Sequence, residues 1–405
     1  MKVLQVNCVY GKGSTGKITY DLHKGMLEAG IESVVCYGRG KHIKESNVYK
    51  TCPEWYSKVN NAISRITGVM YGGCFFSTQK LISIIKKEKP NVVCLQCING
   101  YFVNIYKLVT FLKENRIPTV IVLHAEFMYT ANCAHAYSCE GWLNGCGNCP
   151  RYHKETNSIF FDNTALSWRK MKDAFFDSQD NIQIVSVSPW LQDRAKQSPM
   201  LSQHKHRVVL NGIDTNIFTP TIKEELLNKY KSNNKKIVLH VTARFSDQNK
   251  GGNYILEMAE KLGDDYIVLL VGKGLPSQES VPNKVVCIGE ISDPKELAAY
   301  YSISDVTVLT SKRETFSMIC SESLCCDTPI AGFYAGAPEQ IAHPEYSSFS
   351  EYGDIDGLLK NVIYWANCNK DGKCASVSKK IYNRSVMVDK YIEIFEEMYR
   401  KESKK

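Results

Sequence analysis

Two glutamates and the short segment between them are well suited to chemistry on an anion. Glu314 and Glu322 lie eight positions apart in "TSKRETFSMICSESL". A helix that begins near Ser317 would place Glu314 in the preceding loop and Glu322 in its second turn. The backbone N–H groups of Phe316, Ser317 and Met318 would then lie at the helix start, which favours a bound anion. The alternative interpretation is a capped surface helix with a solvated acid at each end.

Two cations follow the first strand of the same half of the chain. The segment "VTARFSDQNKGG" carries Arg244 and Lys250 in a loop, and "VGKG" and "YAGAPEQ" supply glycines at two further strand ends. Cations, carboxylates and a helix N-terminus at one sheet edge fit a nucleoside diphosphate joined to a hydroxylated group. The cations would stabilise the charge that builds on a departing phosphate.

A glycine-rich loop follows the first strand of the whole chain. In "VYGKGSTGKITYDLHKG", the residues from Gly11 to Lys17 fit the G-x-x-x-x-G-K core of a P-loop. A P-loop NTPase or kinase needs Ser or Thr at the next position to hold Mg²⁺, and Ile18 cannot ligate a cation. Lys17 is either a phosphate contact or a solvated lysine of the first helical turn. Three residues still let the backbone approach a ligand closely and are candidate donor-binding residues: Gly13, Thr15 and Gly16.

Four of the 16 cysteines cluster in "NCAHAYSCEGWLNGCGNCP". The segment contains a C-x2-C knuckle with a glycine between the two thiols, a spacing that suits metal ligation. A long loop without periodicity is uncommon unless something orders it. We expect a structural zinc, and the alternative is four unligated thiols. The candidate ligands are Cys133, Cys139, Cys146 and Cys149, with His135 as a substitute.

The charge around this cluster bears on a third class of function, a zinc-dependent nucleic-acid-binding protein. Such a module should be surrounded by Lys and Arg. Residues 117–150 contain neither, while Glu126 and Glu140 are present. The sequence therefore favours a structural role for the cysteines and no nucleic-acid partner.

Strands and helices alternate along the chain, and the strands are apolar on both faces, as in parallel sheets covered by helices. Two such series of similar size predict an α/β protein with two Rossmann-like, doubly wound domains facing across a cleft. Ligands of such domains bind at the carboxyl ends of the strands. The expected boundaries are 1–212 for the N-terminal domain with its Cys-rich loop at 130–150, 213–234 for a linker, 235–382 for the C-terminal domain, and 383–405 for a C-terminal helix that packs back on the N-terminal domain.

Composition agrees with this division, because 405 residues suit two domains of roughly 200 residues each. The balance of 50 basic and 42 acidic residues gives a net charge of +8, which suits a nucleotide or an acidic membrane face. No apolar run approaches signal-peptide length or the roughly 18 residues that span a bilayer. We therefore expect a cytoplasmic protein. Its basic stretches "KKEKP" and "HKHR" are either peripheral contacts with the cytoplasmic membrane or solvated surface.

These motifs together resemble the retaining glycosyltransferases of family 4, which have the GT-B fold. The resemblance rests on E-x7-E after a strand, on Arg and Lys after the first strand of the second half, on "LNGIDTNIF" and on "GAPE". It covers nearly the whole chain. Within this family, the chain is similar to the bacterial branch that builds capsule, O-antigen and exopolysaccharide. Some members of that branch carry a comparable cysteine loop.

The resemblance implies a reaction and a set of roles, with residues 1–212 as the acceptor-side domain and 235–382 as the nucleotide-sugar donor domain. A sugar would pass from a UDP- or GDP-sugar to a saccharide acceptor, expected to be lipid-linked, with retained configuration and no catalytic metal. Five residues separate Arg244 from Lys250, whereas many members of the family have four. This longer spacing makes Lys250 a stronger candidate than Arg244 for the diphosphate contact. His124, at the end of "TVIVLHA", would face the donor sugar, and its alternative is a satisfied strand-end histidine. Arg244 and Lys250 would bind the diphosphate, Glu314 would contact the sugar hydroxyls, and Glu322 would hold the ribose. The backbone N–H groups of Phe316, Ser317 and Met318 would donate to phosphate. The glycine loop would contact the donor phosphate or the acceptor.

Overall fold

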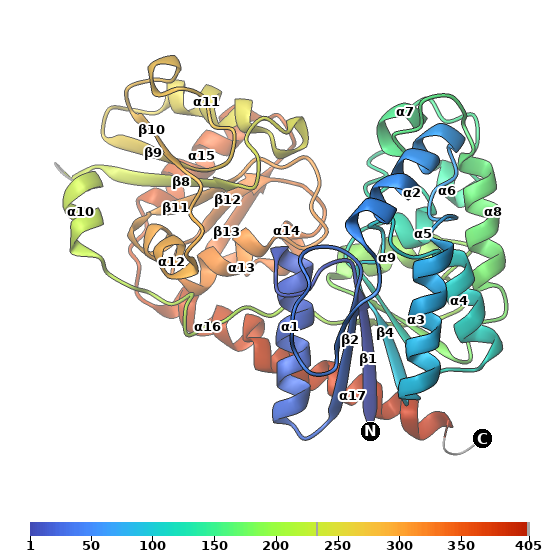
Figure 1. The fold of residues 1–405 in the computed structure, drawn as a ribbon. Coiled ribbons are helices and arrows are strands. Elements are labelled where there is room, and N and C mark those ends of the chain that lie inside the picture. The colour runs from blue at the N-terminus through green and yellow to red at the C-terminus, as the bar shows by residue number, and fades with distance from the viewer. Residues whose placement is uncertain (232–233, 403–405) are drawn as a thin grey trace. The chain divides into compact units, whose positions relative to one another are not determined.

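The computed structural model describes residues 1–231 and 234–402. The chain divides into two compact units (Figure 1). Unit 1 consists of Met1–Leu210 together with the chain from Met387 onward, and unit 2 is Asn211–Val386. Each unit is built on one parallel sheet with helices on both faces, which confirms the prediction of two doubly wound α/β domains.

The sheet of unit 1 has seven strands in the order β3-β2-β1-β4-β5-β6-β7, and every neighbouring pair is parallel. The strands are rich in Val, Ile and Leu and almost entirely buried, as expected for strands covered on both faces. Their bounds are β1 Lys2–Asn7, β2 Glu32–Tyr37, β3 Val48–Lys50, β4 Val92–Leu95, β5 Thr119–Leu123, β6 Ile182–Ser186 and β7 Lys205–Val208.

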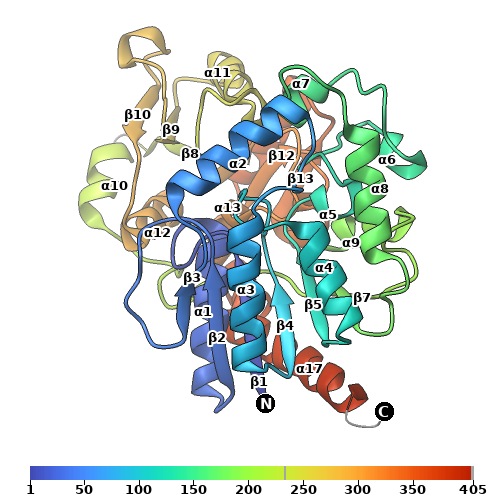
Figure 2. The ribbon, with the colours of Figure 1, turned by 45° about the vertical axis from the view of Figure 1, so that its right-hand side comes forward.

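Helices cover the two faces of this sheet. Figure 2 shows α3, α4 and α8 side by side on one face, with α4 packed between the other two. The helices of the first 210 residues are α1 Gly13–Glu28, α2 Glu54–Thr67, α3 Phe75–Glu88, α4 Ile105–Glu114, α5 Phe127–Thr130, α6 Gly141–Asn144, α7 Tyr152–Glu155, α8 Thr164–Phe175 and α9 Pro189–Gln197.

The last helix of the chain, α17 (Arg384–Glu402), begins in unit 2 and continues in unit 1. Tyr391 and Phe395 are buried in unit 1. A Cβ on Gly25 of α1 would lie 2.7 Å from the methyl carbons of Val388, so α1 and α17 pack closely. The C-terminal helix is thus part of the core of unit 1.

Unit 2 has six parallel strands in the order β10-β9-β8-β11-β12-β13. Side chains of α11 and α15 pack on the buried strands in one apolar core, and α13 packs against α12 and α16. The strands are β8 Lys236–Thr242, β9 Tyr266–Gly272, β10 Val285–Gly289, β11 Val306–Leu309, β12 Ile330–Phe333 and β13 Ser347–Ser350. The helices are α10 Glu224–Tyr230, η2 Gln248–Lys250, α11 Gly252–Lys261, η3 Gln278–Ser280, α12 Pro294–Ile303, α13 Met318–Cys325, α14 Pro338–Ile341, η4 Pro344–Tyr346, α15 Ile355–Ala366 and α16 Lys373–Tyr382.

The segment 213–234, expected as a linker, belongs to unit 2, apart from residues 232–233, which lie outside the described residues. It contains α10 and two buried aromatic side chains. The ring centre of Phe218 lies 6.3 Å from that of Tyr301, and the ring of Tyr230 lies 6.2 Å from that of Tyr300. Burial of these rings attaches the segment to unit 2. The polar composition of the segment had instead indicated a linker.

The strand orders define one switch point in each sheet. The chain leaves β1 toward β2 and later returns to β1's other side with β4, and β8 lies in the same way between β9 and β11. Ligands of doubly wound folds bind beyond the carboxyl ends of the strands at such points. None of the helices within 1–231 and 234–402 is long and apolar enough to cross a membrane.

Candidate active site

An ion pair joins the two loops at the switch point of unit 2. Lys250 Nζ lies 2.7 Å from Glu314 Oε1. Lys250 ends η2 in the loop after β8, and Glu314 follows β11. Their side chains are 31% and 18% exposed, so both remain accessible to a ligand. A cation and a carboxylate therefore meet where this fold binds its ligands.

The backbone of the Lys250 loop is fixed against the end of β11. The Lys250 carbonyl accepts a hydrogen bond from Thr310 Oγ1 at 2.8 Å, and the Lys312 N–H donates to the Asn249 carbonyl at 2.8 Å. Gly251 has φ of +66°, and a Cβ there would lie 2.1 Å from the Thr310 carbonyl oxygen. Only glycine fits this position, because any side chain would collide with backbone.

The loop after β12 holds Glu314 in place. The Glu314 N–H donates to the Ala335 carbonyl at 3.0 Å, and the Glu314 carbonyl accepts from the Ala337 N–H at 3.2 Å. The Glu339 carboxylate accepts hydrogen bonds from the N–H groups of Ala335, at 3.1 Å, and Gly336, at 2.8 Å. Glu339 is a positioning residue that sequence reasoning missed, although it is the glutamate of the "GAPE" motif.

The helix predicted near Ser317 is α13, and Ser317 is its N-cap. Ser317 has φ of +80°, and its Oγ accepts a hydrogen bond from the Cys320 N–H at 3.4 Å. Phe316 is buried, with its ring edge-on to Tyr382 at 6.3 Å between centres. The first N–H groups of a helix have no acceptor within it. The backbone of Phe316, Ser317 and Met318 thus forms a helix start that can receive an anion.

Glu322 lies in the second turn of α13, as predicted. Its Oε2 accepts a hydrogen bond from the Tyr301 hydroxyl at 3.1 Å. Burial, together with this carboxylate, raises the pKa of Tyr301 well above its ordinary value, so the hydroxyl keeps its proton and donates. Arg244 is exposed in the same loop as Lys250, and no hydrogen bond or ion pair recorded among the described residues joins it to Glu314. The structure therefore pairs Lys250 with Glu314 and anchors Glu322 on Tyr301.

In unit 1 a chain of buried amides leads to His124, at the carboxyl end of β5. His124 Nε2 lies 2.7 Å from Gln96 Oε1. Gln96 Nε2 donates to Gln5 Oε1 at 3.4 Å, and Gln5 Nε2 donates to the Thr19 carbonyl of α1 at 3.3 Å. The chain thus links the helix of the glycine loop to His124. Sequence reasoning missed both glutamines, whose only signal is an amide within an apolar strand.

The hydrogen bond fixes the protonation of His124. Burial lowers the pKa of His124 to about 4, so the ring is neutral at neutral pH. Because the amide oxygen of Gln96 can only accept, Nε2 carries the ring proton. His124 therefore presents an oriented, uncharged imidazole at the sheet edge.

The glycine loop joins β1 to α1 at the switch point of the same sheet. Gly11 and Gly13 have φ of +69° and +65°, which other residues rarely adopt. Ile18 is buried and fixes α1 to the sheet, while Lys17 is exposed. The three candidate residues of the loop lie in the first turn of α1: Gly13, Thr15 and Gly16.

The four clustered cysteines are half-buried and unpaired. Within residues 1–231 and 234–402, no three His, Cys, Asp or Glu side chains are arranged as a metal site. Burial, with a smaller contribution from the neighbouring thiols of Cys139 and Cys149, raises the pKa of Cys146 to about 12. Such mutual repulsion of thiolates is what a bound cation relieves. The zinc site stays a prediction.

A buried carboxylate anchors the Cys-rich loop to the end of β5. Glu126 is fully buried, and its Oε1 accepts from Arg194 Nε at 2.8 Å and from the Tyr129 hydroxyl at 2.6 Å. Its Oε2 accepts from the Ala136 N–H at 2.8 Å. The guanidinium of Arg194 lies 5.3 Å from the ring centre of Trp142. These contacts order the loop between His124 and the first cysteines, a role that sequence reasoning missed.

Comparison with known proteins gives a family match to part of the chain and a curated relative that matches most of its length. The model of the family "Glycosyl transferases group 1" matches residues 222–384, which include Lys250, Glu314 and Glu322. Over 354 residues the chain is 24% identical to the "Putative colanic acid biosynthesis glycosyl transferase WcaC" of Escherichia coli (strain K12), covering 84% of this chain and 85% of that protein.

Solved structures match over nearly the full length. Sucrose-phosphate synthase from Thermosynechococcus elongatus has a TM-score of 0.70 and 15% identity, covering 99% of both chains. Anabaena HepE in complex with UDP has a TM-score of 0.65 and 14% identity, covering 98% of this chain and 100% of that one. The fold is the GT-B fold, and the family match with the curated relative shows that the chain is a glycosyltransferase.

Proposed function

We propose that this glycosyltransferase moves a sugar from a nucleoside-diphosphate sugar to a saccharide acceptor, with retained configuration, and that unit 2 binds the donor. The observation that carries the proposal is the Lys250–Glu314 pair, held 2.7 Å apart at the switch point of the six-stranded sheet. Its cation suits the diphosphate, and its carboxylate suits sugar hydroxyls.

Positive charge for the diphosphate comes from several groups of unit 2. Lys250 and Arg244 lie in one loop, and we propose that the backbone N–H groups of Phe316, Ser317 and Met318, at the start of α13 in the segment after β11, contact the same diphosphate. Charge that grows on the leaving diphosphate is stabilised most by donors that are already in place. We propose that this set meets the need without a catalytic metal ion.

The two glutamates take the hydroxylated parts of the donor. Glu314 is held by backbone hydrogen bonds on both sides, so its carboxylate is positioned for the hydroxyls of the sugar. Glu322, anchored by Tyr301, takes the ribose. Carboxylates accept hydrogen bonds from hydroxyls and are repelled by phosphate, which supports their placement away from the diphosphate.

The proposed step is a substitution on one face of the sugar. The bond between the anomeric carbon and the diphosphate oxygen breaks as the acceptor's hydroxyl oxygen bonds to the same face of that carbon. The acceptor's proton passes to the departing phosphate oxygen, so the charges balance. Lys250 and Arg244 stabilise that oxygen while negative charge develops on it.

Unit 1 is proposed to bind the acceptor, with His124 and the glycine loop as its contributing parts. The neutral ring of His124 donates its one proton to Gln96, so its Nδ1 can accept a hydrogen bond from the acceptor without adding charge. The name of the WcaC relative, a colanic acid glycosyl transferase, supports a place in cell-surface polysaccharide synthesis and a lipid-linked acceptor at the cytoplasmic membrane. HepE was solved with UDP and with UDP-glucose, which supports a UDP-sugar over a GDP-sugar.

The decisive test is protection against thermal unfolding by a panel of UDP- and GDP-sugars, followed by release of the nucleoside diphosphate. We expect at least one UDP-sugar to raise the melting temperature, with EDTA present as well as absent. The P-loop alternative on Gly11–Lys17 requires ATP with Mg²⁺ to protect instead. Protection by MgATP alone would reject the proposal.

Zinc in the Cys-rich loop is a separate proposal. It is supported by the C-x2-C spacing and by thiols that raise one another's pKa. Protein purified without chelator should contain equimolar zinc, and Cys146→Ser together with Cys149→Ser should lose it. Substoichiometric zinc in wild-type protein would reject the site without touching the donor proposal.

A further inference from the structure

Helix α2 of unit 1 turns its apolar face outward. Trp55, Val59, Ile63 and Ile66 recur on one side of the helix and are between 47% and 66% exposed. The side turned toward the protein is small and polar, with Ser57, Asn60 and Ser64 buried. This reverses the usual arrangement of a surface helix, in which the apolar face is buried.

Hydrogen bonds hold α2 in this orientation. Ser57 Oγ donates to the Gly100 carbonyl at 3.1 Å, and Ser64 Oγ donates to the Val69 carbonyl at 3.0 Å. Asn60 Oδ1 accepts from the Cys74 N–H at 2.6 Å. Rotating the helix to bury its apolar face would remove the acceptor of the buried Cys74 N–H and leave that group unsatisfied.

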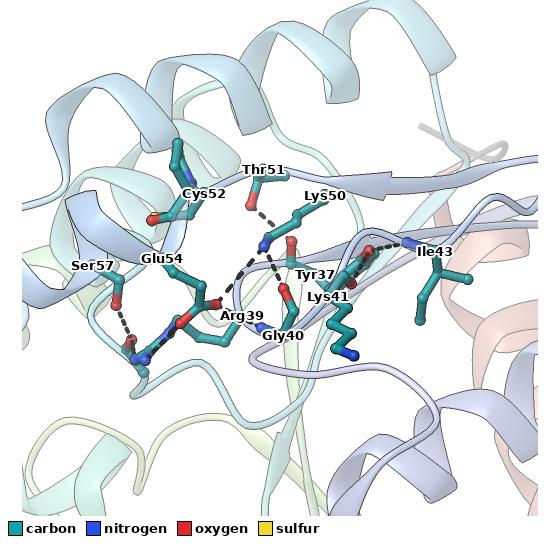
Figure 3. Close-up of polar contacts among 12 residues, drawn as sticks. Tyr37, Arg39, Gly40, Lys41, Ile43, Lys50, Thr51, Cys52, Glu54 and Ser57 are labelled. Atoms are coloured by element: carbon teal, nitrogen blue, oxygen red, sulfur yellow. Dashed lines mark hydrogen bonds and ion pairs between the residues drawn. The ribbon is translucent and has the colours of Figure 1, made fainter.

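The first residue of α2 is tied down as well (Figure 3). The Glu54 carboxylate lies 3.0 Å from the Arg39 guanidinium and 3.8 Å from Lys50 Nζ, and it accepts from the Gly40 N–H at 2.6 Å. Glu54 is the only acidic residue of α2. Its charge is therefore neutralised by neighbours, and the exposed charges of the helix are those of Lys58 and Arg65.

Two neighbouring segments extend the apolar surface. At the start of α3, the Phe76 N–H donates to the Tyr56 hydroxyl of α2 at 3.2 Å. At the other end of α2, the Ile159 N–H donates to the Arg65 carbonyl at 2.7 Å. In Figure 2, α2 runs beyond the carboxyl ends of the strands of unit 1. The combined surface, which we name the α2 patch, consists of Trp55, Val59, Ile63, Ile66, Phe75, Phe76, Ile159, Phe160 and Phe161, all exposed.

Cations border the α2 patch. Lys58 and Arg65 lie seven positions apart, two turns along one edge of α2. Lys107 Nζ lies 4.7 Å from the ring centre of Phe75. Scattered exposed apolar side chains are ordinary, but a grouped set marks an interaction site. Aromatic and aliphatic side chains with a basic rim match the boundary between anionic headgroups and acyl chains.

We propose that the α2 patch docks unit 1 onto the surface of an anionic lipid bilayer. Its aromatic and aliphatic side chains enter the headgroup boundary, and Lys58 and Arg65 contact lipid phosphates. This surface is distinct from "KKEKP" and "HKHR", the basic stretches noted in the sequence. It lies outside the candidate active site, so its test is independent of the donor chemistry.

The test is co-sedimentation of the full chain with vesicles of phosphatidylcholine alone or mixed with phosphatidylglycerol. We expect binding to the anionic vesicles only, weakened by salt. Trp55→Gln with Phe160→Gln, and separately Lys58→Gln with Arg65→Gln, should each reduce the partition coefficient about tenfold, or about 1.4 kcal/mol. Phe176→Gln is the matched control, because Phe176 is a phenylalanine of unit 1 outside the patch that is at least as exposed as Phe160, 74% against 62%.

The variants must keep the wild-type melting temperature, which their exposed positions favour. Absence of binding to anionic vesicles would overturn the proposal, as would an equal loss in Phe176→Gln. A second copy of the chain is the competing occupant. If the apolar variants abolish a concentration-dependent dimer while vesicle binding is absent, the patch is a protein interface and the lipid proposal is wrong.

Discussion

At the scale of single residues, Lys250 and Glu314 constrain each other while both stay accessible. The pair is partly exposed, so its mutual attraction adds less than about 1 kcal/mol to stability. Its position is set instead by backbone hydrogen bonds to Thr310 and Ala335. We therefore expect substitutions here to change catalysis far more than folding.

Lys250→Met should lower turnover by about 10²- to 10³-fold, because it removes a preorganised cation from the leaving diphosphate. The melting temperature should change little. Steady-state release of nucleoside diphosphate measures the effect, and Lys295→Met, an exposed lysine of α12, is the matched control. Turnover within twofold of wild type would show that Lys250 is not part of the donor site.

His124 gives a prediction about pH. Its pKa is about 4 in the folded chain and about 6.5 when unfolded. As pH falls from 6.5 toward 4, the unfolded chain takes up a proton that the folded chain does not, so wild type loses stability. This site should account for about 2–3 kcal/mol of that loss. Urea unfolding of His124→Gln should show a shallower decline than wild type.

The control for this experiment is His42→Gln, because His42 is exposed. Its stability should follow the wild-type dependence on pH. If His124→Gln also follows the wild-type curve between pH 6.5 and 4, the imidazole is not held neutral by burial.

At the scale of elements, Gly251 sets the path from η2 into α11. Gly251→Ala adds a Cβ 2.1 Å from the Thr310 carbonyl oxygen at φ of +66°. Gly289 also has positive φ, of +95°, but its Cβ would meet nothing within 4 Å. Gly251→Ala should cost about 2–4 kcal/mol and lower donor affinity, whereas Gly289→Ala should cost about 1 kcal/mol. Equal losses in chemical denaturation would contradict this account.

The sequence predicted the elements that local patterns encode. The apolar strands, the helix that begins near Ser317 and the loop positions of Lys250 and Glu314 all follow from short segments. The residues that position the site could not be predicted from the sequence, because their partners are distant in the chain. Gln5 and Gln96 are separated by 91 positions, and the sequence around each glutamine gives no signal that the two side chains are in contact. The linker was misplaced because burial of two aromatic rings outweighs polar composition.

At the scale of the whole molecule, α17 makes the two ends of the chain interdependent. Its Phe395 side chain is fully buried in unit 1, while Tyr399, one turn later, is 39% exposed. Phe395→Ala should destabilise unit 1 by about 3–5 kcal/mol, and Tyr399→Ala by less than about 1 kcal/mol. Calorimetry should show the transition of unit 1 shifted. An unchanged transition would mean that α17 does not contribute to that core.

The account as a whole depends on unit 2 being the donor unit, with Glu314 at its centre. The most direct measurement is turnover of the UDP-sugar that protects the wild-type protein, comparing Glu314→Gln with Glu279→Gln, an exposed glutamate of the same unit. We predict that Glu314→Gln loses at least about 10²-fold in turnover with an unchanged melting temperature, while Glu279→Gln retains wild-type turnover. Wild-type turnover by a folded Glu314→Gln protein would contradict the account.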